Sequence, residues 1–232
     1  MLAGLRGRLR SSLLGEAGYV ALAAMVASAT VLLREMAISR SMGLTDEAGS
    51  LLAGLTVATA LAQLVPSTFQ SSAFSVAVST KLERGAGAMR ELLGAISLRF
   101  AGLALVIAGA LVLFGEPLAR GLVTKVDAAT LSSVLPILGA FAVAMALTDL
   151  GKSILGLERR YVAYAIVGGF GNLLLATLIV TTAASSARGI AELASIAFAI
   201  AALVSWAFCL RLGLVRFRAA ARPVVELRRI YG

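Results

Sequence analysis

Charged side chains interrupt the end of a long apolar run, in the stretch VLLREMAISRSMG from Val31 to Gly43. A charge within a membrane helix costs about 2.5–3.5 kcal/mol on insertion scales, so such residues usually face a cavity or a partner. The guanidinium of Arg34 stays charged and donates a planar fork of hydrogen bonds that suits phosphate oxygens. We expect Arg34 to bind an anion, with Glu35 as its charge partner or as an ion-coupling group. The alternative is a self-contained ion pair at the helix end.

A second polar stretch, STFQSS, follows Pro66 at membrane depth. Proline lacks a backbone donor and kinks or ends a helix. The hydroxyl and amide groups that follow it either satisfy the backbone groups set free or line a wet cavity. Gln63, Gln70, Ser71 and Ser72 are therefore candidates for neutral hydrogen bonds to a ligand.

Two further polar positions lie in the second half of the chain. Asp149 and Lys152 are three positions apart in one apolar segment, so they share a helix face and can pair. Asp149 and Glu35 are the acidic residues of the expected spans, which makes both candidates for ion coupling. Asn172 lies within GGFGNLLLA, whose glycines indicate helix packing or a flexible point. Arg99 lies near the start of a span, and we expect it to snorkel to the interface.

The composition defines the class of protein that must position these residues. Hydrophobic residues make up 59% of the chain and charged residues 14%, against about 25% in a soluble domain. The mean hydropathy is +0.94. Several apolar runs are long enough to span a bilayer, and they do not alternate with period two as barrel strands do. These features predict an all-α polytopic membrane protein with about six transmembrane helices.

Several function classes have no residues to support them. The chain has no histidine and one cysteine, Cys209, so an intramolecular disulfide, a Cys/His zinc site and a Ser-His-Asp triad are excluded within it. It also lacks a Gly-rich phosphate loop and a nucleophile motif. We therefore expect no enzymatic activity, no metal and no cofactor. The net charge of +9 indicates basic segments beside anionic lipid rather than a nucleic-acid partner.

Apolar runs and turn residues predict the order of the elements. Gly54, Ala58 and Ala62 form a stripe of small residues, which favours close helix packing. We divide the chain into a basic N-terminus (1–15), a membrane domain (16–212) and a basic tail on the membrane surface (213–232). Expected helices cover 16–42, 48–66, 91–114, 131–157, 161–183 and 189–212, with an aqueous loop at 81–90 and an interfacial connection at 118–130.

The distribution of Lys and Arg predicts the orientation. With six spans and the N-terminus inside, most of the 21 Lys and Arg residues fall on the cytoplasmic side. The opposite side holds only Arg120, Lys125 and Arg188. We therefore expect both termini in the cytoplasm.

The segments LLREMAISRSMGLTDEAG and LTVATALAQLVPSTFQSSAFSVAVSTKLERG resemble the first two helices of the MviN/MurJ family. These are lipid-linked peptidoglycan precursor flippases of the multidrug/oligosaccharidyl-lipid/polysaccharide exporter superfamily. The family has an Arg-acid pair late in helix one and a Phe-Gly turn, matched here by Arg34-Glu35 and Met42-Gly43. Its second helix ends in a segment of the type AFSQAFVPV, matched here by residues 70–77.

The later part of the chain is similar to the same family, with two departures. The LGLERRY turn and Asn172 fit the family's fourth and fifth helices. Ala62 and Gln63, however, stand where the family has a pair of arginines, which removes half of the expected anion-binding charge. The chain also resembles only the N-terminal six-helix lobe of a two-lobed protein, which leaves three alternatives: a fragment, a half-size protein that dimerises, or a degenerate relative.

The resemblance implies a flippase of the bacterial cytoplasmic (inner) membrane, built as one lobe of an exporter-type bundle. Its partners would be membrane lipids and a lipid diphosphate-linked glycan. One lobe cannot enclose a cavity for alternating access, so a homodimer or a partner membrane subunit is expected. The implied cavity residues are Arg34, Glu35, Gln63, Gln70, Ser71, Ser72 and Asn172, with Glu35 and Asp149 as coupling candidates.

Two other functions compete with this one. The missing arginines and the absent second lobe favour a non-transporting scaffold subunit of a larger membrane complex. An ion-coupled exporter of small solutes is the third hypothesis. Such an exporter would need more acidic residues in its spans than Glu35 and Asp149.

Overall fold

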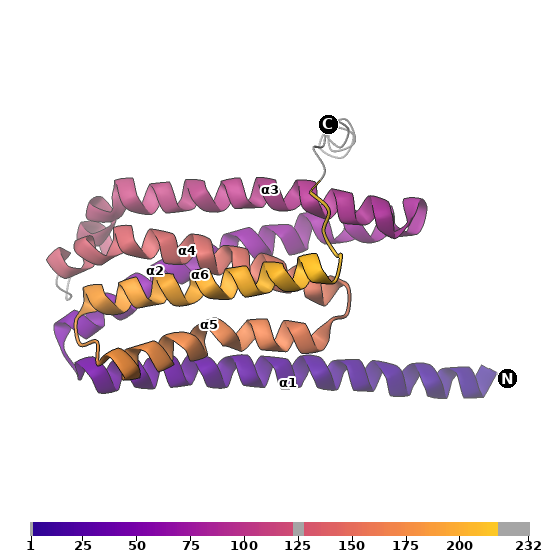
Figure 1. Ribbon diagram of the computed structural model, residues 1–232, viewed down its shortest axis with the longest axis horizontal. Helices are drawn as coiled ribbons and strands as arrows, with labels where there is room; N and C mark the ends of the chain where they lie inside the picture. Colours follow the sequence, from indigo (N-terminus) through magenta and orange to yellow (C-terminus); the bar gives the residue numbers. More distant parts are fainter. Residues whose placement is uncertain (1, 123–127, 218–232) are drawn as a thin grey trace.

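The computed structural model describes the backbone of residues 2–122 and 128–217, and the side chains of 18, 19, 21–121 and 128–217. All regular elements in this part of the chain are helices, which run back and forth along one common direction (Figure 1). The predicted all-α class is confirmed. The elements are α1 (Leu2–Met42), α2 (Asp46–Thr68), the π-helix η1 (Phe69–Ala73), α3 (Phe74–Leu122), α4 (Ala128–Leu157), α5 (Tyr161–Thr182) and α6 (Ala187–Arg211).

Helix α3 consists of two antiparallel arms joined at Gly85. Gly85 has φ 85° and ψ 172°, a conformation that favours glycine because it has no Cβ. Figure 1 shows the chain reversing at this end of the bundle. The expected loop at 81–90 is therefore wrong as a backbone assignment, since its residues are helical on both sides of Gly85. Charge predicts contact with water there, and the charged side chains achieve this contact from a helix.

The number of membrane passes follows from this reversal. Five helical stretches are long and apolar enough to cross a membrane, and one of them runs from Asp46 to Gly121. Gly85 divides that stretch into two segments, 46–84 and 86–121, of about 55 Å each at about 1.5 Å per residue. Each segment exceeds the roughly 30 Å of hydrocarbon in a bilayer. The protein is thus a multi-pass membrane protein with about six transmembrane helices, as predicted.

Pro66 does not end its helix, contrary to the expected boundary. Helix α2 continues through it into η1, where Phe69 N–H donates to the carbonyls of Val65 and Pro66. The helix thus continues past a residue that has no backbone N–H to donate, and the π-helical turn begins three residues later. Nearby hydroxyls complete the backbone: Thr68 Oγ1 donates to Leu64 O (2.6 Å), and Ser72 Oγ donates to Thr68 O (2.6 Å).

The remaining boundaries differ modestly from the predicted ones. Helix α1 begins at Leu2 rather than 16, and the second arm of α3 extends to Leu122. Most of the expected connection at 118–130 is therefore helical, apart from 123–127, which lie outside the described residues. The described tail ends at Phe217, so the expected surface location of the tail lies mostly outside that part too.

Local chemistry explains where the other helices start and stop. Gly43, with φ 69°, ends α1, and the Thr45 hydroxyl accepts a hydrogen bond from Ala48 N (3.1 Å) to cap α2. Ser186 caps α6 in the same way, accepting from Gly189 N (3.2 Å). These caps satisfy backbone donors that a helix start leaves free.

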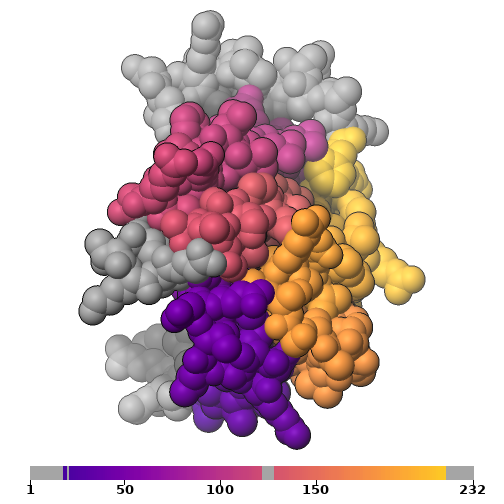
Figure 2. Space-filling view, turned by 90° about the vertical axis from the view of Figure 1, so that its left-hand side faces the viewer, coloured from indigo at the N-terminus to yellow at the C-terminus, as the bar shows by residue number. Residues whose placement is uncertain are grey.

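The helices pack in two groups, one around α4 and one formed by α1 and α5. Helix α1 packs on α5, whereas α2 and α3 pack on α4. In Figure 2, which looks along the bundle from the end where α1 finishes, α1 and α3 lie at opposite edges. The predicted small-residue stripe is buried between α2 and α4, and a Cβ at Gly54 would lie 2.9 Å from Leu138 Cδ1. Its packing role is confirmed.

Candidate functional site

A cavity of about 450 Å³ opens between α1 and α2, which diverge because each packs on a different partner helix. Its charged wall is formed by Arg34 and Glu35. The opposite wall, from α2, presents two threonines and small or aliphatic side chains. The described lining consists of Arg34, Glu35, Leu52, Leu55, Thr56, Thr59 and Ala60.

Arg34 is held by two partners in this wall. Its Nε donates to Glu35 Oε1 at 3.2 Å, and Nη2 forms an ion pair with the same carboxylate. Its Nη1 donates to Asn172 Oδ1 on α5 at 3.1 Å. The Arg34 side chain is 12% exposed and that of Glu35 37%. The predicted pair is confirmed, and Asn172 turns out to be the residue that orients it.

The glycines before Asn172 bring α5 against α1. A Cβ at Gly169 would lie 3.1 Å from Thr30 Cγ2 on α1, and one at Gly171 would lie 3.1 Å from Phe198 on α6. Small residues allow helices in membranes to approach closely. The glycine run therefore serves packing, and this packing places the buried Asn172 amide within reach of Arg34.

A second polar cluster joins α2, α4 and α5. Lys152 Nζ pairs with Asp149 Oδ1 at 3.2 Å, as the three-residue spacing predicted. Gln63 Nε2 donates to the other oxygen, Asp149 Oδ2, at 2.8 Å. Lys152 Nζ also lies 5.4 Å from the centre of the Tyr164 ring, within cation–π range. Gln63 and Asp149 thus bind each other rather than lining the Arg34 cavity.

The remaining candidates lie elsewhere. Gln70 Nε2 donates to Ser153 Oγ on α4 at 3.0 Å, while Ser71 Oγ donates to Thr68 O at 3.1 Å. Ser72 lines a different cavity, between the arms of α3. The seven predicted cavity residues therefore do not form one site: only Arg34, Glu35 and Asn172 come together. Thr56 and Thr59 were missed because a threonine in an apolar helix gives no sign of the cavity it faces.

The Arg34 cavity is suited to binding an anion rather than to bond-making chemistry. A guanidinium carries five N–H groups, and the contacts described use one from each of its three nitrogens, which leaves donors for a ligand. Among the residues described, no three His, Cys, Asp or Glu side chains gather as they would around a metal. No family model matches the chain, and neither a curated protein nor a solved structure matches it.

Proposed function

We propose that this chain is one lobe of a flippase that moves a lipid-linked glycan diphosphate across the bacterial cytoplasmic membrane, with Arg34 binding the phosphates. The observation that carries the proposal is the orientation of Arg34 by Asn172 at the wall of the cavity between α1 and α2. A diphosphate cannot cross hydrocarbon unaided because its charges lose their hydration. A fixed guanidinium at the wall of this cavity offers replacement hydrogen bonds.

Glu35 supplies a means of coupling. Its carboxylate already neutralises Arg34, so a diphosphate must compete with it for the guanidinium. Glu35 is about three times as exposed as Arg34, which lets it turn to a cation on the cavity side. Neutralising Glu35 in this way frees Arg34 for the phosphates. Substrate binding and ion binding would then favour each other.

A second lobe completes the proposed transporter. The described lining of the Arg34 cavity comes from α1 and α2 alone, so in this proposal a second lobe faces it, from a longer chain, another copy or a partner subunit. Rocking of two lobes about the substrate would give alternating access. The excess of Lys and Arg in the segments assigned to the cytoplasm places both termini there in this proposal.

The experiment compares two arginines of one helix. Purified protein is reconstituted into liposomes with a fluorescent lipid-linked glycan diphosphate, and translocation is followed by quenching from outside. Arg34→Gln is expected to slow translocation at least tenfold, since a charge-assisted hydrogen bond contributes about 1.5–3 kcal/mol. Arg40→Gln is the matched control, because Arg40 is an exposed residue of α1 outside the described cavity lining.

Two results of the translocation assay would contradict the proposal. Equal translocation by the two variants would remove Arg34 from the mechanism. No translocation by the folded wild type, alone or with a partner subunit, would reject the flippase.

A scaffold subunit is the second candidate, and the pairing of Arg34 favours it. Arg34 already has a carboxylate partner within the chain, and none of the five α2 residues that line the cavity is charged: Leu52, Leu55, Thr56, Thr59 and Ala60. A scaffold would copurify with other membrane subunits. Its complex would survive Arg34→Gln, whereas a flippase would lose transport.

A further inference from the structure

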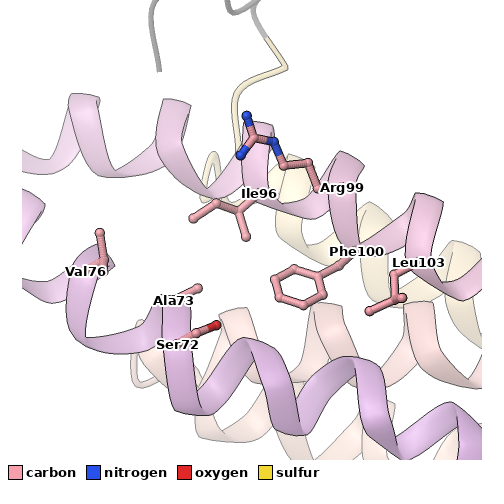
Figure 3. Close-up of a pocket in the computed structure, with 7 residues that line it drawn as sticks. All are labelled: Ser72, Ala73, Val76, Ile96, Arg99, Phe100 and Leu103. Carbon is pink, nitrogen blue, oxygen red and sulfur yellow. The ribbon is translucent and has the colours of Figure 1, made fainter. Parts of the chain in front are cut away.

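A second cavity, of about 240 Å³, lies between the two arms that meet at Gly85. Figure 3 shows its walls, with one set of side chains from η1 and the first arm and the other from the second arm. It is distinct from the Arg34 cavity, and the two share no described lining residue. The lining residues are Ser72, Ala73, Val76, Ile96, Arg99, Phe100 and Leu103.

The arms are held apart by their own packing. Phe69, at the start of η1, meets Phe100 edge to face, with ring centres 5.7 Å apart. Further towards Gly85, η1 presents the small side chains of Ser72 and Ala73 to the second arm, and the first arm presents Val76. Small residues opposite an aromatic ring leave a space that the chain itself does not fill.

Arg99 gives this cavity a charged end. Its side chain is exposed and has no hydrogen bond or ion pair with another residue in the described part of the chain. In Figure 3 the guanidinium extends over Ile96, on the side towards Gly85, and away from Phe100 and Leu103. The cavity therefore has a cationic end and an apolar end, and none of its described lining residues is acidic.

The direction of this polarity matches a bilayer. Charged residues gather around the reversal, namely Lys81, Glu83, Arg84, Arg90 and Glu91, so this end lies outside the hydrocarbon. Arg99 follows Glu91 by about 12 Å along the helix. A long side chain directed towards the reversal brings its guanidinium up to the level of the headgroups. The apolar end at Leu103 points towards the middle of the membrane.

We propose that this cavity binds an anionic phospholipid, with one acyl chain between Val76, Phe100 and Leu103 and the phosphate on Arg99. The volume is below the roughly 300–1,000 Å³ of sites that enclose drug-sized ligands, so it takes part of one chain rather than a whole lipid. An anionic headgroup is preferred to a zwitterionic one because Arg99 has no acidic partner among the described residues. The site stands independently of the flippase proposal.

The test counts lipids bound to the purified protein. Native mass spectrometry with added phosphatidylglycerol or phosphatidylcholine gives the affinity of the first bound lipid. Wild type is expected to prefer phosphatidylglycerol about tenfold, the size that a charge-assisted hydrogen bond supports. Arg99→Gln is expected to lose this preference, and Arg40→Gln, also exposed, to keep it. Equal losses in the two variants would overturn the assignment of the phosphate to Arg99.

A second pair of variants tests the acyl chain. Val76→Phe fills the cavity, whereas Val78→Phe adds the same ring at an exposed position outside the described lining. Val76→Phe is expected to bind phosphatidylglycerol more weakly, and Val78→Phe is expected to bind it as wild type does. Thermal unfolding checks that both variants are folded. Unchanged binding in Val76→Phe would reject the cavity as the chain site. If millimolar inorganic phosphate displaced the lipid, the proposal would also be rejected, because the site would then bind a small anion rather than a phospholipid.

Discussion

Asp149 is the most completely satisfied acidic residue of the described spans. Lys152 and Gln63 occupy its two oxygens, and the Lys152 stem passes beside Gly168, where a Cβ would lie 3.6 Å from Lys152 Cδ. Its side chain is 15% exposed and that of Lys152 24%. The carboxylate thus joins α4 to α2, and Lys152 extends the cluster to Tyr164 on α5. Its use as a coupling group would require Lys152 to leave first.

Removing one charge of this pair is expected to destabilise the bundle more than removing both. Asp149→Asn leaves the Lys152 ammonium without its counter-ion in the span. Breaking a fully buried pair lowers the free energy of unfolding by about 3–5 kcal/mol, and the loss is smaller here because both groups are partly exposed. The double variant Asp149→Asn with Lys152→Met removes the uncompensated charge. Thermal unfolding in detergent measures both. A double variant less stable than Asp149→Asn would contradict this account.

Sequence predicts polar contacts within a helix better than contacts between helices. The pairs Arg34–Glu35 and Asp149–Lys152 follow from spacing along one helix. The bonds from Arg34 to Asn172 and from Gln63 to Asp149 join distant segments. Which helices meet depends on the packing of apolar faces and glycines, and periodicity alone does not specify that packing.

At the scale of elements, the two arms of α3 depart most from expectation. A charged, glycine-containing segment predicts exposure to water and a loop, and only the exposure is found. A helix needs only one residue, Gly85, to reverse its direction when the flanking residues remain helical. Pro66 likewise leaves the helix intact, and the π-helical turn begins only three residues after it.

The chain beyond α6 returns to the second arm of α3. Arg216 N donates to Arg90 O at 3.0 Å, and Leu214 and Val215 are buried in the core formed with Met89 and Leu93. A Cβ at Gly94 would lie only 2.3 Å from Arg216 O. Glycine at this position is therefore what lets the two backbones meet.

Alanine at Gly94 is expected to detach this segment. Gly94→Ala should lower the unfolding temperature in detergent by several degrees, since about 1 kcal/mol moves it by about 2–4 °C in a chain of this size. Gly87→Ala is the control: it lies on the same arm with open space around it, so it gains helix propensity. Equal shifts for both variants would show that the contact at Gly94 contributes no stability.

At the scale of the molecule, two buried clusters divide the bundle along its length. On α4, the first cluster ends at Ala146 and the second begins at Leu150, with Asp149 between them. Composition and apolar runs predicted the membrane class and the number of passes, because these depend on the solvent. They did not predict the two cavities, which depend on how α1 and α2, and the two arms of α3, diverge.

Thiol labelling is expected to show that water reaches the Arg34 cavity. In a Cys209→Ala background, Thr56→Cys should react quickly with a water-soluble maleimide, because the thiolate that reacts needs water. Leu113→Cys is the control, on an apolar part of α3 where the native side chain is 76% exposed. Native Cys209 is fully buried. Equally slow labelling at both positions would mean that lipid tails fill the cavity.

The return of the chain to α3 also has a consequence for biosynthesis. Residues 214–217 leave the ribosome after every helix described, yet they cover a backbone position on α3. The surface around Gly94 is therefore bare while α4, α5 and α6 are still being inserted. A translational arrest or a truncation before Leu214 is expected to leave an inserted, incompletely closed bundle, which a membrane protease would recognise at that end.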